Sequence, residues 1–286
     1  MDEGPPGVPV TTLLAVLGSP IAHSKSPALH AAAYGVLGLD WSYTAVEATE
    51  ETLAEVIARE RWRGLSLTMP LKHAVRPMLA EEDLVARATG AVNTVLVEGR
   101  RLRGFNTDVA GIVRALAEAG VASAERVEVL GGGATAASAI AAAAELGASR
   151  VTVTLRSPEK AAALEPVATA LGVALDIRSF AEWGRGEPHP LVVSTLPGGA
   201  ADALEVPDAV VASSTLFDVA YSPWPSALAL RWRAAGSPVV SGFGMLLHQA
   251  LVQVRIFVGG DPEVPLPGEG AVLAAMRAAV PGEPAS

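Results

Sequence analysis

Polar residues that could do chemistry follow short apolar segments, and a lysine stands out among them. Lys72 comes directly after residues 68–71 (TMPL), where a proline-fixed turn would hold its side chain in place. A lysine that is partly removed from water can transfer protons, because burial disfavours its charged form. Asp108 supplies a carboxylate within the segment 104–111, although an acid in a first helical turn is also commonly structural. The two residues are therefore candidates for acid–base chemistry.

Other polar residues could bind an anionic substrate. Ser24 and Ser26, in the segment 18–27, can each direct a hydroxyl toward a carboxylate, or they can cap the helix expected near Pro27. Asn93 and Thr107 add uncharged hydrogen-bonding groups. Gln249 lies in an apolar helix, where its amide could equally be buried and satisfied by the backbone.

A glycine-rich turn between a strand and a helix indicates a nucleotide site. The strand expected over 126–130 is followed by Gly131, Gly132 and Gly133 and by an uncharged helix that begins near Ala134. Such glycines let the backbone approach a pyrophosphate, and the free N–H groups of the helix start attract it. Ala136 replaces the third glycine, which the pattern allows. A turn of this kind can also be merely structural.

The end of the next strand indicates the type of cofactor. An NAD site would place an acidic residue there for the ribose hydroxyls, and none is present. Arg156, Ser157 and Lys160 could instead surround a 2′-phosphate, which favours NADP. The alternative is that Arg156 and Lys160 only form the solvated start of a helix.

The composition excludes several classes of protein. The chain has 286 residues, a formal net charge of −9 and no cysteine. The acidic balance argues against a general binder of nucleic acid or membranes, and the lack of cysteine excludes disulfides and thiolate catalysis. The five histidines show no ligand spacing with carboxylates, so we expect no metal. Uncharged stretches over 4–24 and 234–254 are interrupted by prolines, glycines or polar residues, so we expect a soluble, cytoplasmic protein.

The apolar pattern predicts the framework that must position these residues. Valine-, leucine- and threonine-rich runs alternate with alanine-rich stretches of helical length, which is typical of parallel sheets covered by helices on both faces. The predicted strands are 12–17, 42–47, 64–68, 93–97, 126–130, 150–155, 191–195 and 215–219. The predicted helices lie near 27–38, 50–61, 107–119, 135–146, 159–171 and 224–235.

Taken together, the motifs resemble the shikimate dehydrogenase family, NADP-dependent enzymes of aromatic amino-acid biosynthesis. The resemblance spans residues 14–259, and the motifs occur with family-like spacing. The runs that carry it are HSKSP (23–27), TMPLK (68–72), AVNT (91–94), GFNTD (104–108) and GMLLHQA (244–250). The segments 131–135 and 221–225 are most similar to the actinobacterial branch.

The resemblance implies roles for individual residues on the substrate side. Lys72 and Asp108 match the family's catalytic pair, and Ser24 and Ser26 match its carboxylate-binding serines. The positions that hold the ring hydroxyls are matched by Thr68, Asn93, Thr107, Tyr221 and Gln249.

The resemblance also implies an NADP(H) site. The phosphate loop is matched by Gly131, Gly132, Gly133, Ala134 and Thr135, and the adenosine-phosphate clamp by Arg156, Ser157 and Lys160. The nicotinamide side is matched by Thr195, Val219, Gly242 and Met245. The sequence departs from the family at Ser66, Leu155 and Ser222, where asparagine is common. Because Leu155 cannot donate or accept a hydrogen bond, the clamp depends more on Arg156 and Ser157.

The implied reaction is the reversible NADPH-dependent reduction of 3-dehydroshikimate to shikimate, with hydride passing between nicotinamide C4 and substrate C3. We expect Lys72 to handle the accompanying proton and Asp108 to hydrogen-bond both the lysine and the C4 hydroxyl. The alternatives are a paralogous quinate or aminoshikimate dehydrogenase and a catalytically silent cofactor-binding regulator.

The expected organisation has two α/β domains with a cleft between them. A substrate-binding domain would cover residues 1–107, and a Rossmann-like, doubly wound NADP-binding domain would cover 108–241. Helices in 242–286 would return to the first domain and bring Gln249 to the cleft. We expect a small-molecule substrate as partner, neither nucleic acid nor membrane, and a monomer or homodimer.

Overall fold

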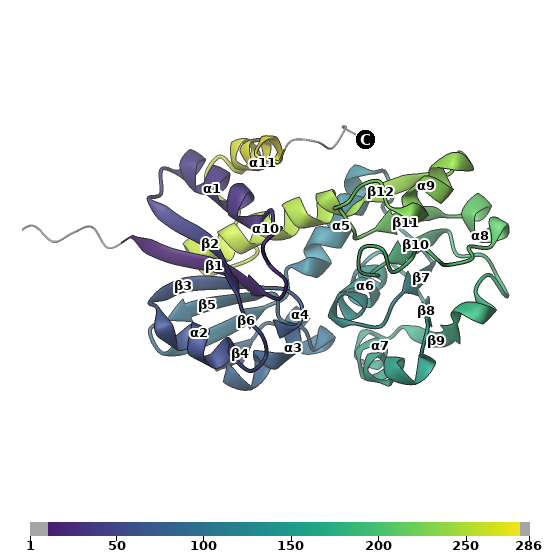
Figure 1. The fold of residues 1–286 in the computed structure, drawn as a ribbon, viewed down its shortest axis with the longest axis horizontal. Helices are drawn as coiled ribbons and strands as arrows, with labels where there is room; N and C mark the ends of the chain where they lie inside the picture. The colour runs from purple at the N-terminus through teal and green to yellow at the C-terminus, as the bar shows by residue number, and fades with distance from the viewer. Residues whose placement is uncertain (1–10, 281–286) are drawn as a thin grey trace, which may run out of the picture.

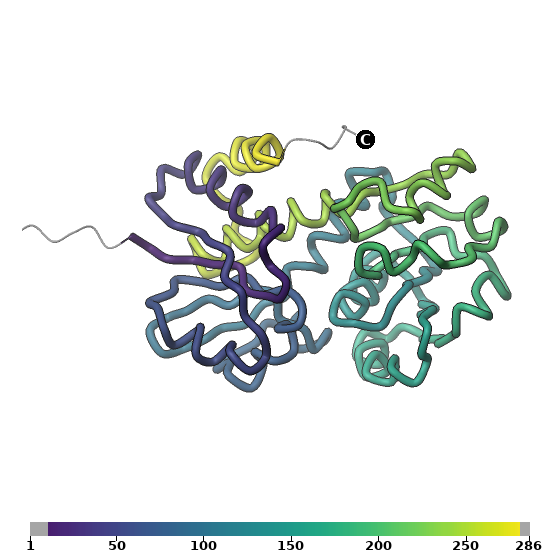
Figure 2. Tube along the Cα trace, viewed as in Figure 1, coloured from purple at the N-terminus to yellow at the C-terminus, as the bar shows by residue number. Residues whose placement is uncertain are grey.

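The computed structural model describes residues 11–280, whose strands form two six-stranded sheets that lie side by side (Figure 1). Helix α5 (Asp108–Glu118) carries the chain from the first half to the second, and α10 (Gly242–Gly259) brings it back (Figure 2). The two helices pack against each other between the sheets. The predicted α/β fold is confirmed by this arrangement.

The first sheet is parallel in one part and antiparallel in the other. Its order is β2-β1-β3-β5-β6-β4; β2, β1 and β3 are parallel, whereas β5 is antiparallel to both its neighbours. The expectation of a wholly parallel sheet is wrong here, because β5 and β6 form a hairpin whose two-residue turn contains Gly99 at φ 66°. The strands are β1 (Thr12–Gly18), β2 (Trp41–Glu47), β3 (Trp62–Leu67), β4 (Glu81–Glu82), β5 (Thr94–Glu98) and β6 (Arg101–Phe105).

Both faces of this first sheet are buried, as the alternation along β1 shows. Leu14 and Val16 belong to a core shared with α1, α10 and α11, whereas Ala15 and Leu17 belong to a core shared with α2 and α3. The helices of this half are α1 (Ser26–Leu37), α2 (Leu53–Arg59), α3 (Leu71–Ala74), α4 (Leu84–Thr89) and α11 (Glu269–Ala278), with a 3₁₀ turn over Arg76–Met78.

The second sheet is fully parallel and doubly wound, as predicted. Its order is β12-β11-β10-β7-β8-β9, and the direction of winding reverses between β7 and β10. In such sheets a ligand binds outside the carboxyl ends of the strands at this reversal. The strands are β7 (Arg126–Leu130), β8 (Arg150–Leu155), β9 (Ala174–Ser179), β10 (Leu191–Ser194), β11 (Thr215–Asp218) and β12 (Val239–Ser241).

Helices cover both faces of the second sheet, and two of them differ from the prediction. The helix predicted over 159–171 is divided into a 3₁₀ segment and α7, with Pro166 in the first turn of α7, where a proline is tolerated. The helix predicted over 224–235 starts later, after Pro225, and is capped by Ser226, which accepts a hydrogen bond from the backbone N–H of Ala229. The helices of this half are α6 (Ala134–Glu145), α7 (Glu165–Leu171), α8 (Asp208–Ser213) and α9 (Ala227–Ala234), with 3₁₀ segments over Pro158–Leu164 and Phe180–Glu182.

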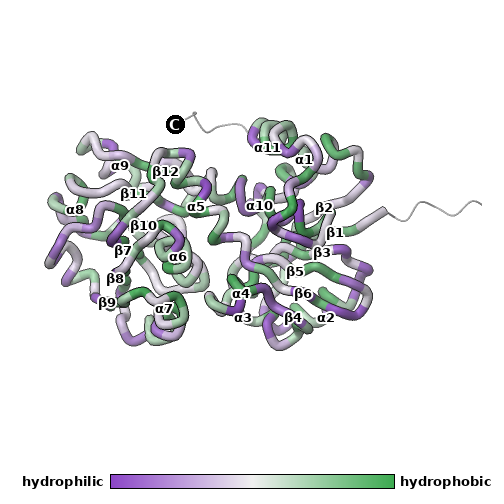
Figure 3. Tube along the Cα trace, turned by 180° about the vertical axis from the view of Figure 1, so that it is seen from behind, coloured by the Kyte–Doolittle hydropathy of each residue, from purple (hydrophilic) through white to green (hydrophobic). Residues whose placement is uncertain are grey.

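Helix α10 is the most buried long helix in the described part of the chain. By length and composition it could cross a membrane, but 78% of it is buried inside the protein, which is typical of a core helix. The trace coloured by hydropathy shows hydrophilic residues gathered on the outer turns of both halves (Figure 3). The burial of α10 matters for the site, because its first turns bring polar residues to the space between the two sheets.

Candidate active site

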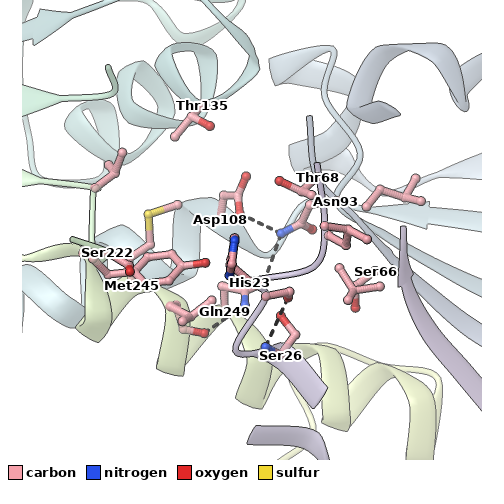
Figure 4. A pocket seen from close by; sticks show the side chains of 18 of the residues that line it. His23, Ser26, Ser66, Thr68, Asn93, Asp108, Thr135, Ser222, Met245 and Gln249 are labelled. Atoms are coloured by element: carbon pink, nitrogen blue, oxygen red, sulfur yellow. Dashed lines mark hydrogen bonds between the residues drawn. The ribbon is translucent and has the colours of Figure 1, made fainter. Parts of the chain in front are cut away.

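A cavity of about 650 Å³ lies between the two halves and is lined by residues of both (Figure 4). The carboxyl ends of β1 and β3 border it on one side, and the segment after β11 borders it on the other. The predicted site residues in its lining are Ser24, Ser26, Thr68, Lys72, Asn93, Asp108, Thr135, Val219, Tyr221, Gly242, Met245 and Gln249.

The predicted pair Lys72 and Asp108 forms an ion pair in this cavity. Lys72 lies on the short helix α3 after β3, and its Nζ is 2.6 Å from Oδ2 of Asp108, the first residue of α5. The lysine side chain is 13% exposed and the aspartate side chain 5%. The carboxylate does not cap its helix, whose N-cap residue is Thr107. Asp108 is an acid in the first turn of α5, as the structural alternative expects, but its carboxylate is bound by Lys72 and Asn93.

Asn93 fixes the second oxygen of this carboxylate. Its Nδ2 donates to Asp108 Oδ1 at 2.8 Å, while its Oδ1 accepts a hydrogen bond from the backbone N–H of Thr107 at 2.9 Å. Because a backbone N–H can only donate, the orientation of the Asn93 amide is determined. Both oxygens of Asp108 are thus engaged, and the carboxylate is held in one position.

Thr107 and Gln249 complete this cluster in different ways. Thr107 is buried and does not line the cavity; its Oγ1 accepts from Asn93 Nδ2 at 2.9 Å and lies 3.4 Å from Gln249 Oε1, so it contacts two residues of the lining. Gln249 lines the cavity, and its Nε2 donates to the carbonyl oxygen of Leu246 at 2.8 Å. Gln249 thus makes the hydrogen bond to the backbone that a buried amide would make, and this bond holds its side chain at the cavity.

Ser24 lies in the loop between β1 and α1 and Ser26 is the first residue of α1; both line the cavity. The N-cap of α1 is Lys25, and no side-chain hydrogen bond caps this helix. Ser24 is not the N-cap residue, but its Oγ accepts a hydrogen bond from the backbone N–H of Ser26 at 3.3 Å, so it satisfies one N–H group at the helix start while facing the cavity. Across the cavity lies Tyr221, and burial raises the pKa of its hydroxyl, which keeps it a neutral hydrogen-bonding group.

The glycine-rich turn lies at the reversal point of the second sheet. Gly131 has φ 109°, a conformation that favours glycine, and a Cβ on Gly132 would lie 2.9 Å from Cδ1 of Leu155. Nothing lies within 4 Å of the Cβ position of Gly133, the N-cap of α6. The turn is therefore open beside Gly133 at the start of α6, where the N–H groups of a helix can bind a phosphate.

The remaining cofactor candidates surround this turn rather than the cavity. Thr195, which follows β10, donates from Oγ1 to the carbonyl oxygen of Leu130 at 2.8 Å. Arg156, Ser157 and Lys160 follow β8, with Arg156 and Lys160 exposed. The residues of the predicted site that do not line the cavity are Thr107, Gly131, Gly132, Gly133, Ala134, Arg156, Ser157, Lys160 and Thr195.

Several residues of the cavity lining were absent from the predicted site. They include Ser66, at the end of β3, and Gln253, one turn after Gln249 on α10. The spacing of four residues between the two glutamines places both on one face of a helix, and this signal could have indicated Gln253. Within residues 11–280, no group of three or more metal-ligating side chains is found.

The sequence and the fold are both similar to those of known proteins. The profile of a family described as the shikimate dehydrogenase substrate binding domain matches residues 16–95. A protein of Citrifermentans bemidjiense named shikimate dehydrogenase (NADP(+)) is 35% identical over 96% of this chain and 98% of its own.

Solved structures show the same similarity. The crystal structure of Mycobacterium tuberculosis shikimate dehydrogenase has a TM-score of 0.81 and 38% identity, covering 93% of this chain and 99% of its own. The Thermus thermophilus shikimate 5-dehydrogenase, solved in complex with NADP(H) and shikimate, has a TM-score of 0.79 and 32% identity, covering 94% and 100%.

Proposed function

The chain belongs to the shikimate dehydrogenase family, and we propose that it interconverts 3-dehydroshikimate and shikimate with NADP(H) in the cavity between its two halves. It is an oxidoreductase that acts on a secondary alcohol. The observation that carries this function is the buried Lys72–Asp108 pair at 2.6 Å in a cavity that also contains Ser24 and Ser26. A proton-transfer pair and a carboxylate-binding pair in one cavity match a hydroxylated ring acid.

The residues around the glycine-rich turn fit NADP(H). The backbone of 131–135 would hold the pyrophosphate at the start of α6, and Arg156, Ser157 and Lys160 would hold the 2′-phosphate. The segment from Val219 and the residues Gly242 and Met245, which line the cavity, would border the nicotinamide. When bound, the cofactor supplies the hydride.

Lys72 holds and moves the proton of the reacting oxygen. In the reducing direction the ammonium donates a proton to the oxygen on C3, and in the oxidising direction the neutral amine accepts it. Asp108 holds Lys72 in place through their ion pair and accepts a hydrogen bond from the C4 hydroxyl. Ser24 and Ser26 hold the carboxylate at the opposite end of the ring, so that C3 faces Lys72.

A steady-state assay with shikimate or quinate and with NADP or NAD tests this function. We expect the highest kcat/KM with shikimate and NADP. A preference for quinate and NAD would indicate the paralogous activity, and a lack of turnover at saturating shikimate and NADP would indicate a cofactor-binding regulator.

A further inference from the structure

A buried network of hydrogen bonds connects the cavity to the interior of the first half. At its centre is Gln253 on α10, which lines the cavity and is almost wholly buried. Its Nε2 is 3.3 Å from the backbone carbonyl oxygen of Asn93 and 3.0 Å from Oγ1 of Thr94. Because a carbonyl oxygen only accepts, the nitrogen of the Gln253 amide must face it. The amide oxygen, Oε1, therefore faces the other way.

Two groups share that amide oxygen. Ser66 Oγ lies 2.8 Å from Gln253 Oε1, and Nε2 of His30 lies 3.2 Å from the same atom. The ring of His30 is stacked on that of Tyr43 with centroids 3.8 Å apart, and its Nδ1 is 3.1 Å from the hydroxyl of Tyr34. Burial lowers the pKa of His30 to about 3, so the ring is neutral at assay pH and its one N–H points to Gln253.

These contacts determine where the proton of Ser66 lies. An amide oxygen has no proton to give, so the bond between Ser66 and Gln253 must use the hydroxyl proton of Ser66. Tyr43 then donates its own hydroxyl proton to Ser66 Oγ, at 2.6 Å. The Ser66 hydroxyl has one proton and two lone pairs, and only one lone pair remains for a ligand.

We propose that Gln253 is a positioning residue for substrate recognition: by holding the only proton of Ser66, it leaves Ser66 able only to accept a hydrogen bond from a hydroxyl of the substrate ring. The inference rests on the proposed function. The C3 oxygen is the reacting one, and the single proton of the C4 hydroxyl goes to Asp108, so the group that Ser66 recognises is the C5 hydroxyl of shikimate. A substrate analogue is therefore disfavoured if its ring carries, in place of that hydroxyl, a group that cannot donate a hydrogen bond to Ser66.

Fluorinated substrates test this inference, because fluorine cannot donate a hydrogen bond. The assay compares kcat/KM for shikimate with kcat/KM for two analogues in which the C4 or the C5 hydroxyl is replaced by fluorine. In the wild type we expect the analogue altered at C5 to lose about 10- to 100-fold relative to shikimate. In Gln253→Met the Ser66 hydroxyl is free to turn its proton toward the cavity, and we expect the loss to shrink to about 3-fold or less. The analogue altered at C4 loses its hydrogen bond to Asp108, so its loss should not depend on residue 253.

Three further variants make the result specific. Ser66→Ala removes the hydroxyl itself, so it should also reduce the discrimination, that is, the ratio of kcat/KM for shikimate to kcat/KM for the analogue fluorinated at C5. Gln253→Glu keeps an oxygen that can accept from Ser66, so it should retain the wild-type discrimination and remains informative if Gln253→Met does not fold. Leu251→Met, a buried change of similar volume on the same helix outside the cavity lining, should behave as the wild type.

Two outcomes would overturn the inference. In the first, Gln253→Met lowers kcat/KM for shikimate and both analogues by the same factor, as a purely structural residue would. In the second, Ser66→Ala keeps the full discrimination. The function proposed above is judged separately, by the turnover of shikimate itself in the wild type.

Discussion

The positions of single protons decide what this cavity can recognise and do. The ion pair between Lys72 and Asp108 fixes the lysine Nζ beside the carboxylate, where it can donate a proton when a ketone is reduced. Asn93 holds the other carboxylate oxygen, which prevents Asp108 from rotating away from the lysine. A guanidinium at position 72 could form the same ion pair but would not release its proton at workable pH.

Replacement of Lys72 separates proton transfer from binding. We expect Lys72→Ala to lower kcat by about 10²- to 10⁴-fold, because general acid–base catalysis has this magnitude, while KM for shikimate changes little. Lys72→Arg should lose activity to a similar extent although it keeps the charge beside Asp108. Steady-state kinetics measure kcat and KM for both variants. Full turnover by Lys72→Ala would show that another group carries the proton.

Motifs predicted the residues that touch the cavity better than those that support them. Lys72, Asp108 and Asn93 lie in short conspicuous runs and are brought together as expected. Gln253 and His30 were not predicted, because neither lies in a conspicuous motif and their contact joins positions 223 residues apart in the sequence. The binding of the cofactor's 2′-phosphate by Arg156, Ser157 and Lys160, which follow β8, stays a prediction.

At the scale of elements, the crossing of α5 and α10 positions both sides of the cavity. Gly111 lies where the two helices are closest: a Cβ there would be 2.8 Å from the carbonyl oxygen of Met245 and 2.9 Å from Cβ of Gln249. The strands were well predicted, because apolar runs of five or six residues bounded by turn residues are distinctive. Four strands were not predicted: the half-buried β9 and the arginine-rich β6 lack such runs, and β4 and β12 have only two and three residues.

The close approach of these helices makes Gly111 intolerant of a larger side chain. We expect Gly111→Ala to lower the free energy of unfolding by about 1–3 kcal/mol and to raise KM for shikimate, because α10 must move and carries Gln249 with it. Gly35→Ala is the matched control, since nothing lies within 4 Å of that Cβ on α1, and it should stabilise the protein by about 0.5–1 kcal/mol. Urea unfolding and steady-state kinetics measure both. If Gly111→Ala were as stable and active as the control, the helices would not be held at this distance.

At the scale of the whole molecule, the carboxyl ends of β1 and β3 face the segment that follows β11 across one cavity. Most of the polar motifs follow a strand, although the segment 91–94 with Asn93 precedes β5, so the sequence could indicate which strand ends carry function. It could not indicate how the two sheets face each other, because that depends on the side-by-side packing of α5 and α10. The proposed division into segments 1–107, 108–241 and 242–286 stays a prediction.

The burial of His30 makes the stability of the whole molecule sensitive to acid. His30 is 0% exposed, and burial lowers its pKa from 6.5 to about 3. Below pH 6.5 the unfolded chain binds a proton that the folded protein excludes, so the free energy of unfolding decreases as the pH falls toward 3. Between pH 7 and pH 4 this residue alone should remove about 3 kcal/mol. The variant His30→Gln has no group that titrates at this position. Urea unfolding measures the difference in the free energy of unfolding between the wild type and the variant. We expect this difference to be about 3 kcal/mol smaller at pH 4 than at pH 7, and to stay constant between pH 7 and pH 9. A difference that does not change between pH 7 and pH 4 would mean that the folded protein admits the proton.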